Sequence, residues 1–165
     1  MHKLKQVLIA AAAAGLAAAG SALAQPASAP LFTNVSPDQI KWRDYPGEYG
    51  AWGMKSASVM GDSSKPGLYV ERVVMPAHVM STPHTHPTDR IAYVLKGTYY
   101  VGTSATWDPA KTIAVPAGGV IQIPRDAVHF DGARDEDVTV QFVAVGPSGR
   151  TAINPADPPF RKSPN

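Results

Sequence analysis

Cysteine is absent from this 165-residue sequence. Its absence excludes disulfide bonds, even in an oxidising compartment where disulfides would persist. It also excludes thiolate ligands, so a metal site must use nitrogen and oxygen donors. The chain is nevertheless long enough to bury a hydrophobic core as one domain without such cross-links.

The sequence also lacks an excess of charge of one sign. The formal net charge of +2 rests on Lys3 and Lys5, and residues 25–165 carry 13 basic and 13 acidic side chains. Such a near-neutral chain offers no basic patch for nucleic acid and no polybasic helix for anionic lipid. Nucleophile-elbow, phosphate-loop and dinucleotide-binding motifs are missing too, so serine hydrolase, NTP-dependent and NAD-dependent chemistry have no support.

A long apolar run lies near the N-terminus, from Val7 to Ala19. Two lysines precede it, and Ala22-Leu23-Ala24 follows it as a small-x-small cleavage pattern. The alternative, a membrane anchor, is disfavoured because the run is short for a bilayer and the cleavage pattern follows directly. Residues 1–24 are therefore predicted to be a signal peptide. The mature protein is predicted to be periplasmic or secreted, without membrane association.

The rest of the chain divides into a flexible leader at residues 25–37, a single domain at 38–153 and a proline-rich C-terminal tail at 154–165. Helical periodicity is nearly absent from the domain. Short apolar or alternating segments recur about every ten residues, with glycine and proline between them, which is typical of an all-β sandwich or barrel. The predicted strands are 67–75, 91–95, 98–101, 112–115, 120–123 and 138–145.

Three of the four histidines in the mature chain fall in two short motifs. His84 and His86 are two residues apart, so on an extended chain they point to the same side and can bind one ion together. His129 follows a predicted strand and a turn beginning at Pro124, an arrangement that would return a third imidazole to the barrel. The fourth, His78, is expected in a separate turn. A pair of histidines alone is a weak signal, because imidazole has many uses.

Taken together, the two motifs resemble the two-part signature of the cupin superfamily. They are H-x-H at His84–His86 and G-x5-P-x4-H from Gly118 to His129. The segment from Gly61 to Gly67 and the Gly146-Pro147 turn resemble small single-domain bacterial cupins of the cupin-2-like group. The resemblance implies a jelly-roll-like β-barrel, often a homodimer. It also implies a divalent transition metal (Fe, Mn, Ni or Zn) held by His84, His86 and His129 in the barrel mouth.

The sequence departs from the cupin pattern at the fourth ligand. That pattern places a glutamate four residues after the second histidine, where this chain has Arg90. A guanidinium stays protonated and has no lone pair to give to a metal. Three alternatives follow. Either Arg90 turns out of the pocket, or the metal ion is bound weakly, or the metal ion is absent. A bulge would let Asp89 supply an oxygen instead, although strand alternation opposes this, and a solvated loop at both residues is the simpler alternative.

Other side chains are candidates for contact with a small-molecule ligand. Facing inward, Arg90 would form an anion clamp, because its planar fork holds a carboxylate or phosphate. Asp89, Tyr99 and Gln122 are further candidates, with packing or solvation as the competing interpretation. Two functions remain open. One is a metal-dependent enzyme of oxygenase, lyase or isomerase class acting on a small polar molecule, and the other is a non-catalytic binding module.

Overall fold

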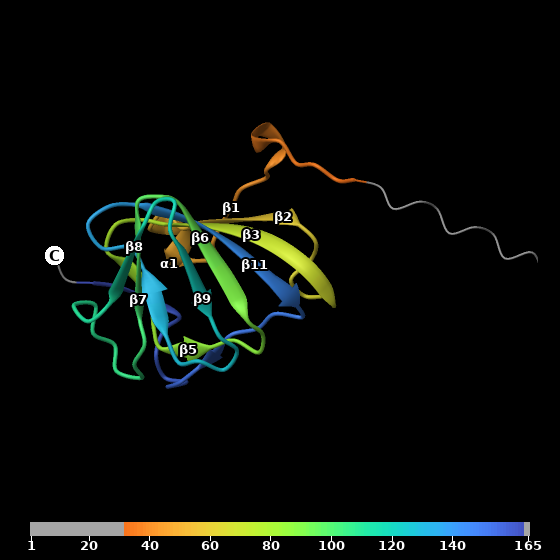
Figure 1. Cartoon of the computed structure of the whole chain (residues 1–165). Coiled ribbons are helices and arrows are strands. Elements are labelled where there is room, and N and C mark those ends of the chain that lie inside the picture. Colours follow the sequence, from red (N-terminus) through yellow and green to blue (C-terminus); the bar gives the residue numbers. More distant parts are fainter. Residues whose placement is uncertain (1–31, 164–165) are drawn as a thin grey trace, which may run out of the picture. The chain divides into compact units, whose positions relative to one another are not determined.

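The computed structural model describes residues 32–163 (Figure 1). The predicted signal peptide and most of the predicted leader lie outside the described residues. From Asn34 onward the chain forms one compact unit. Among the described residues, no helix is long and apolar enough to cross a membrane.

Strands build nearly all of this unit, and all of their pairings are antiparallel. The larger sheet contains, in spatial order, β1 (Arg43–Asp44), β2 (Lys55–Met60), β3 (Gly67–Met75), β11 (Val138–Gly146), β6 (Arg90–Lys96) and β9 (Val120–Ile123). The second sheet contains β13 (Phe160–Lys162), β4 (Val79–Ser81), β10 (Phe130–Gly132), β7 (Thr98–Gly102) and β8 (Ile113–Pro116). The remaining elements are the β12–β5 pair (Thr151–Ala152 and His84–Thr85), a 3-10 turn η1 (Pro37–Gln39) and a single-turn helix α1 (Glu48–Ala51).

The core lies between the two large sheets, which face each other in Figure 1. The larger sheet contributes Val73, Val94 and Val140, and the second sheet contributes Tyr99 and Val101. Each of these side chains is at most 6% exposed. This two-layer antiparallel arrangement confirms the predicted all-β, jelly-roll-like single domain.

All six predicted strands are present. β3 and β9 begin and end where they were predicted, β7 and β11 differ by one residue at one end, and β6 and β8 differ by one residue at both ends. Sequence periodicity did not indicate the six-residue strand β2, nor the short strands β1, β4, β5, β10, β12 and β13, since segments of two or three residues carry no measurable alternation. These strands are defined instead by their pairing with neighbouring strands. Two of them, β5 and β10, lie beside the histidines.

Strand β6 directs alternate side chains into the interior. Arg90, Ala92 and Val94 are buried, whereas Ile91 and Tyr93 between them are exposed. From Arg90 to Tyr93 the strand is held on both sides, by β11 and by β9, so its register is fixed over this part. The predicted alternation is therefore confirmed, and it places the Arg90 side chain inside the molecule.

The proline-rich segment contributes one edge strand. Within residues 154–165, β13 pairs with β4 at the end of the second sheet. An edge position suits such a segment, because proline cannot donate a hydrogen bond to a neighbouring strand. The Phe160 ring packs edge-on against Tyr45 and Tyr49, at centroid distances of 5.6 and 5.2 Å. This packing covers one side of the cavity described below.

Candidate metal centre

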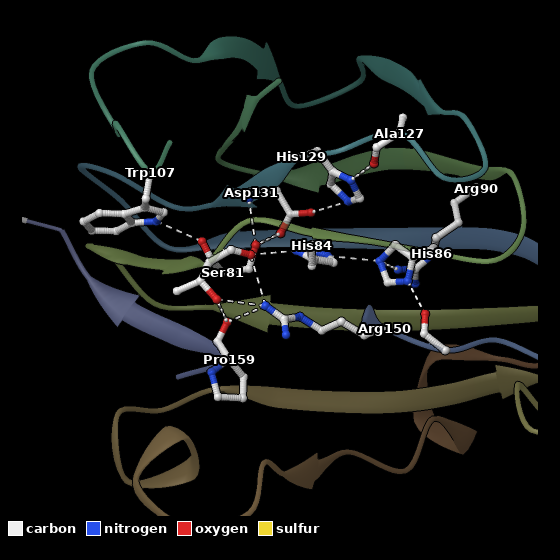
Figure 2. A network of polar contacts seen from close by, with 12 residues as sticks. Ser81, His84, His86, Arg90, Trp107, Ala127, His129, Asp131, Arg150 and Pro159 are labelled. Atoms are coloured by element: carbon white, nitrogen blue, oxygen red, sulfur yellow. Dashed lines mark hydrogen bonds and ion pairs between the residues drawn. The ribbon is translucent and has the colours of Figure 1, made fainter. Parts of the chain in front are cut away.

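Strand pairing brings the three predicted histidines together, as Figure 2 shows. His84 begins β5, and His129 immediately precedes β10. The two residues form a β-bridge in which each backbone N–H donates to the other's carbonyl, at 2.8 and 3.0 Å. His86 lies two residues beyond His84 and points to the same side. One ring nitrogen of each imidazole lies within 4.8 Å of the other two.

The three imidazoles are held by the same kind of backbone contact. The Nδ1 atom of His84 lies 2.8 Å from the Thr82 carbonyl oxygen, and that of His129 lies 2.9 Å from the Ala127 oxygen. The Nδ1 atom of His86 contacts the Gly149 oxygen. A carbonyl can only accept, so each Nδ1 carries the proton and each Nε2 keeps its lone pair. This is the tautomer of a metal-ligating histidine.

The lone pairs of these histidines converge on one region. The Nε2 atoms of His84 and His86 are 3.1 Å apart, although neither carries a proton to share. Neighbouring nitrogens at about 2.1 Å from one metal ion are separated by about 3.0 to 3.4 Å. The Nε2 atom of His129 is buried and has no hydrogen-bond partner. Three convergent lone pairs, two of them at ligand spacing, fit a divalent transition metal.

Burial keeps the imidazoles of His84 and His86 neutral. It lowers the pKa of His84 to about 4. Burial and, after it, the positive charge of Arg90 lower the pKa of His86 to about 3. A neutral imidazole is the form that a metal requires, since a protonated ring has no lone pair.

Arg90 lies inside the site. Its side chain is buried, and its Nη1 atom donates a hydrogen bond of 2.8 Å to Nε2 of His86. The guanidinium stacks over the Phe142 ring, 4.2 Å from the centroid. The alternatives that turned Arg90 out of the pocket or into solvent are therefore wrong, because β6 alternation places it on the side of Ala92. In this position Arg90 occupies the lone pair that His86 would offer to a metal.

The other predicted ligand-contacting residues lie elsewhere. Asp89 is exposed, and its carboxylate accepts the Arg125 backbone N–H at 2.7 Å, so it does not face the histidines. Gln122 is exposed and lines a second hollow, to which His129 also contributes, and it does not line the cavity beside His84 and His86. Tyr99 is fully buried in the core, where burial and then the Asp131 carboxylate raise the pKa of its hydroxyl. His78 lies in the turn between β3 and β4, away from the cluster.

A cavity of about 250 Å³ adjoins the histidines. Its lining combines the His84 and His86 rings with four ionisable side chains, which are Glu71, Arg90, Asp131 and Arg150. Burial raises the pKa of Glu71 and lowers that of Arg150. The cavity is large enough for a small polar molecule, and it presents charges of both signs to that molecule.

Sequence reasoning missed three of these charged residues. A signal existed for Asp131, because it follows His129 by two residues and therefore points to the same side of an extended strand. The Asp131 Oδ2 atom lies 3.5 Å from the His129 Nε2 atom. Glu71 and Arg150 carried no local signal. They reach the cavity through pairing and loop packing between segments far apart in the sequence.

A family model described as Cupin matches residues 63–160. No curated protein matches the chain. Among similar solved structures, KdgF from a Halomonas species is 20% identical with a TM-score of 0.55, covering 70% of this chain and 94% of that one. The polyketide cyclase RemF from Streptomyces resistomycificus is 17% identical with a TM-score of 0.61, covering 78% and 90%. The DMSP lyase DddQ from Ruegeria pomeroyi is 15% identical with a TM-score of 0.57, covering 72% and 64%. At these identities the likeness shows the fold alone.

Proposed function

The chain belongs to the cupin family, and on that premise we propose that it is a metal-dependent enzyme acting on a small polar molecule. His84, His86 and His129 would hold a divalent transition metal. The observation that carries the proposal is that each Nδ1 atom is bonded to a backbone carbonyl, which directs the three unprotonated Nε2 atoms toward one another in the interior. Three imidazoles suit iron, manganese, nickel or zinc.

A metal bound there would supply Lewis acidity and a coordination position open to substrate or water. The protein supplies the surroundings. Arg90 and Arg150 offer cationic donors to a negatively charged group in the cavity. Glu71 lines the same cavity with a raised pKa, caused mainly by burial, so it is suited to exchange a proton with a bound molecule. The backbone carbonyls of Thr82, Ala127 and Gly149 orient the rings.

Proteins of similar fold include enzymes, which supports a catalytic function in general but does not indicate the reaction. Two of these structural neighbours are a cyclase and a lyase. One fold hosts many chemistries, and this chain shares at most 20% identity with the three structures described. The oxygenase, lyase and isomerase classes therefore remain alternatives within the proposal.

One observation favours a second candidate, a non-catalytic binding module. The hydrogen bond from Arg90 to Nε2 of His86 occupies a metal-ligand position. If Arg90 stays there, the cavity holds a guanidinium in place of a metal. The protein would then bind a small carboxylate or phosphate through Arg90 as an anion clamp.

Metal analysis distinguishes the two candidates. Untagged protein purified from the periplasm of an expressing bacterium is expected to contain about one equivalent of iron, manganese, nickel or zinc by mass spectrometry. The His129→Ala variant should lose that metal, and His78→Ala should keep it, because His78 lies away from the cluster. A wild-type protein that is metal-free and refuses each added metal would exclude the enzyme and leave the anion-binding module.

We also propose that the protein is exported and cleaved before Gln25, which the basic, apolar and small-residue pattern of residues 1–24 supports.

A further inference from the structure

We infer that Asp131 supplies the carboxylate ligand of the metal centre. In the cupin pattern that carboxylate is a glutamate, at the position where this chain has Arg90. The inference rests on the proposed function, since it requires that His84, His86 and His129 hold a metal. It assigns the fourth protein ligand to β10 instead of β6.

The distance between Asp131 and His129 is the first argument. The Asp131 Oδ2 atom lies 3.5 Å from Nε2 of His129, close to the spacing of two ligand atoms on one ion. The Nδ1–H group of His129 is directed to the Ala127 carbonyl, so its Nε2 faces the carboxylate with a lone pair. Two electron-rich atoms facing each other in a buried site repel, and a cation between them, either a proton on His129 or a metal ion, removes that repulsion. Only the three ring nitrogens lie mutually within 4.8 Å, so a metal that also bound Asp131 would draw its carboxylate closer to the other two histidines.

The charge of Asp131 is the second argument. The residue is 8% exposed, and among the described residues it makes no ion pair with a lysine or an arginine. A buried carboxylate without a cationic partner is costly, and a divalent ion would supply that partner. The carboxylate also lies at the His129 side of the cluster, whereas Arg90 approaches from the His86 side, as Figure 2 shows.

The contacts that orient Asp131 are the third argument. Its Oδ1 atom accepts a hydrogen bond of 3.0 Å from the Ser81 hydroxyl, and its backbone N–H donates to the same hydroxyl at 2.8 Å. The Trp107 indole N–H donates to the Ser81 carbonyl at 2.9 Å and holds that residue in turn. Ligating carboxylates are characteristically fixed in this way, with one oxygen hydrogen-bonded and the other directed at the metal.

Moving the carboxylate from β6 to β10 explains how the site tolerates Arg90. The ligand set keeps three nitrogens and one oxygen, with one negative charge. The position on β6 is then free for a cationic side chain that can meet an anionic group in the cavity.

Titration of metal-free protein with Co²⁺ tests the assignment, because the visible absorption of Co²⁺ reports its ligands. The Asp131→Asn variant has nearly the same shape without the charge. It is expected to bind Co²⁺ at least about tenfold more weakly, with an altered visible spectrum. Asp89→Asn is the matched control, and it should keep the wild-type affinity and spectrum because Asp89 is exposed and faces away. Circular dichroism would verify that each variant is folded.

Three outcomes would overturn the inference, and they are distinguishable. Wild-type affinity and spectrum in Asp131→Asn would exclude ligation. Weaker binding with an unchanged spectrum would show that Asp131 attracts the ion only through its charge and is not a ligand. Failure of the wild-type protein to bind Co²⁺ would refute the proposed function before any substitution is made. If Asp131→Asn does not fold, Ser81→Ala replaces it, since that variant releases the carboxylate from its anchor; an unchanged Co²⁺ affinity and spectrum there would contradict the inference.

Discussion

Replacing Arg90 by methionine should strengthen metal binding. The Arg90 Nη1 atom lies 2.8 Å from Nε2 of His86, on the lone pair that a metal needs at about 2.1 Å. The guanidinium and the ion cannot share that space, so Arg90 must leave before the metal binds. Methionine keeps a long side chain against Phe142 and removes both the charge and the competing hydrogen bond.

The expected size of the effect follows from electrostatics. A guanidinium that withdraws to about 6 Å from a divalent ion still repels it by about 5 kcal/mol at an effective dielectric constant of about 20. Relaxation, water and bound anions reduce this figure, which is an upper bound. We expect the Arg90→Met variant to bind the metal at least about tenfold more tightly, corresponding to about 1.4 kcal/mol.

Isothermal titration of metal-free protein with Zn²⁺ or Mn²⁺ measures the change. Arg125→Gln is the matched control, because it removes the same charge from a side chain that is 70% exposed. It should leave the affinity within about twofold of wild type, since an exposed distant charge is screened. If Arg90→Met binds metal no more tightly than wild type, then Arg90 and the metal do not compete, and the reasoning from the His86 contact is wrong.

Three further predictions concern pH, packing and export. The pKa values of His84 and His86 are lowered in the folded protein, mainly by burial, to about 4 and about 3. The unfolded chain therefore takes up protons first as the pH falls, and metal-free protein should lose on the order of 5 kcal/mol of unfolding free energy between pH 6.5 and 4 in urea titrations. In Gly102→Ala, the new methyl group would overlap the Phe130 ring. Thermal melts of this variant should show that its free energy of unfolding is about 1 to 3 kcal/mol lower than that of the wild-type protein. Mature protein from the periplasm should begin at Gln25 by N-terminal sequencing.

Each of these three predictions has a contradicting result. The pH prediction fails if the His84→Ala, His86→Ala double variant keeps the wild-type loss of stability on acidification. For the packing prediction, Gly149→Ala is the control, because a methyl group there meets no atom closer than 3.8 Å. Equal melting of the two alanine variants would contradict it. Full-length protein in the cytoplasm, beginning at Met1, would contradict export.

Local pattern was sufficient for six of the strands and for the three histidines. Strand prediction succeeded where strands are long and alternating, as in β3 and β11, because burial of one face imposes a period of two residues. The same period placed His84 and His86 on one side of the chain and Arg90 on the side of Ala92, but whether that side was buried at Arg90 stayed open until the structure showed it. These predictions concern residues that are close together along the chain, so they need no knowledge of contacts with residues far away in the sequence.

The sequence by itself therefore determined the all-β fold, the cluster of His84, His86 and His129, and the departure at Arg90. Tertiary structure decided what each group does within the site. Only the folded chain brings the carbonyls of Thr82, Ala127 and Gly149 to the Nδ1 atoms and so selects the ring tautomers. Only the fold brings Ser81 to Asp131 and Arg90 to His86. The physical reason differs between these contacts. Gly149 and His86 are 63 positions apart and Ser81 and Asp131 are 50 apart, so only the fold brings them together. The other contacts join residues two or four positions apart, and there the folded backbone fixes the side-chain directions, which spacing alone does not.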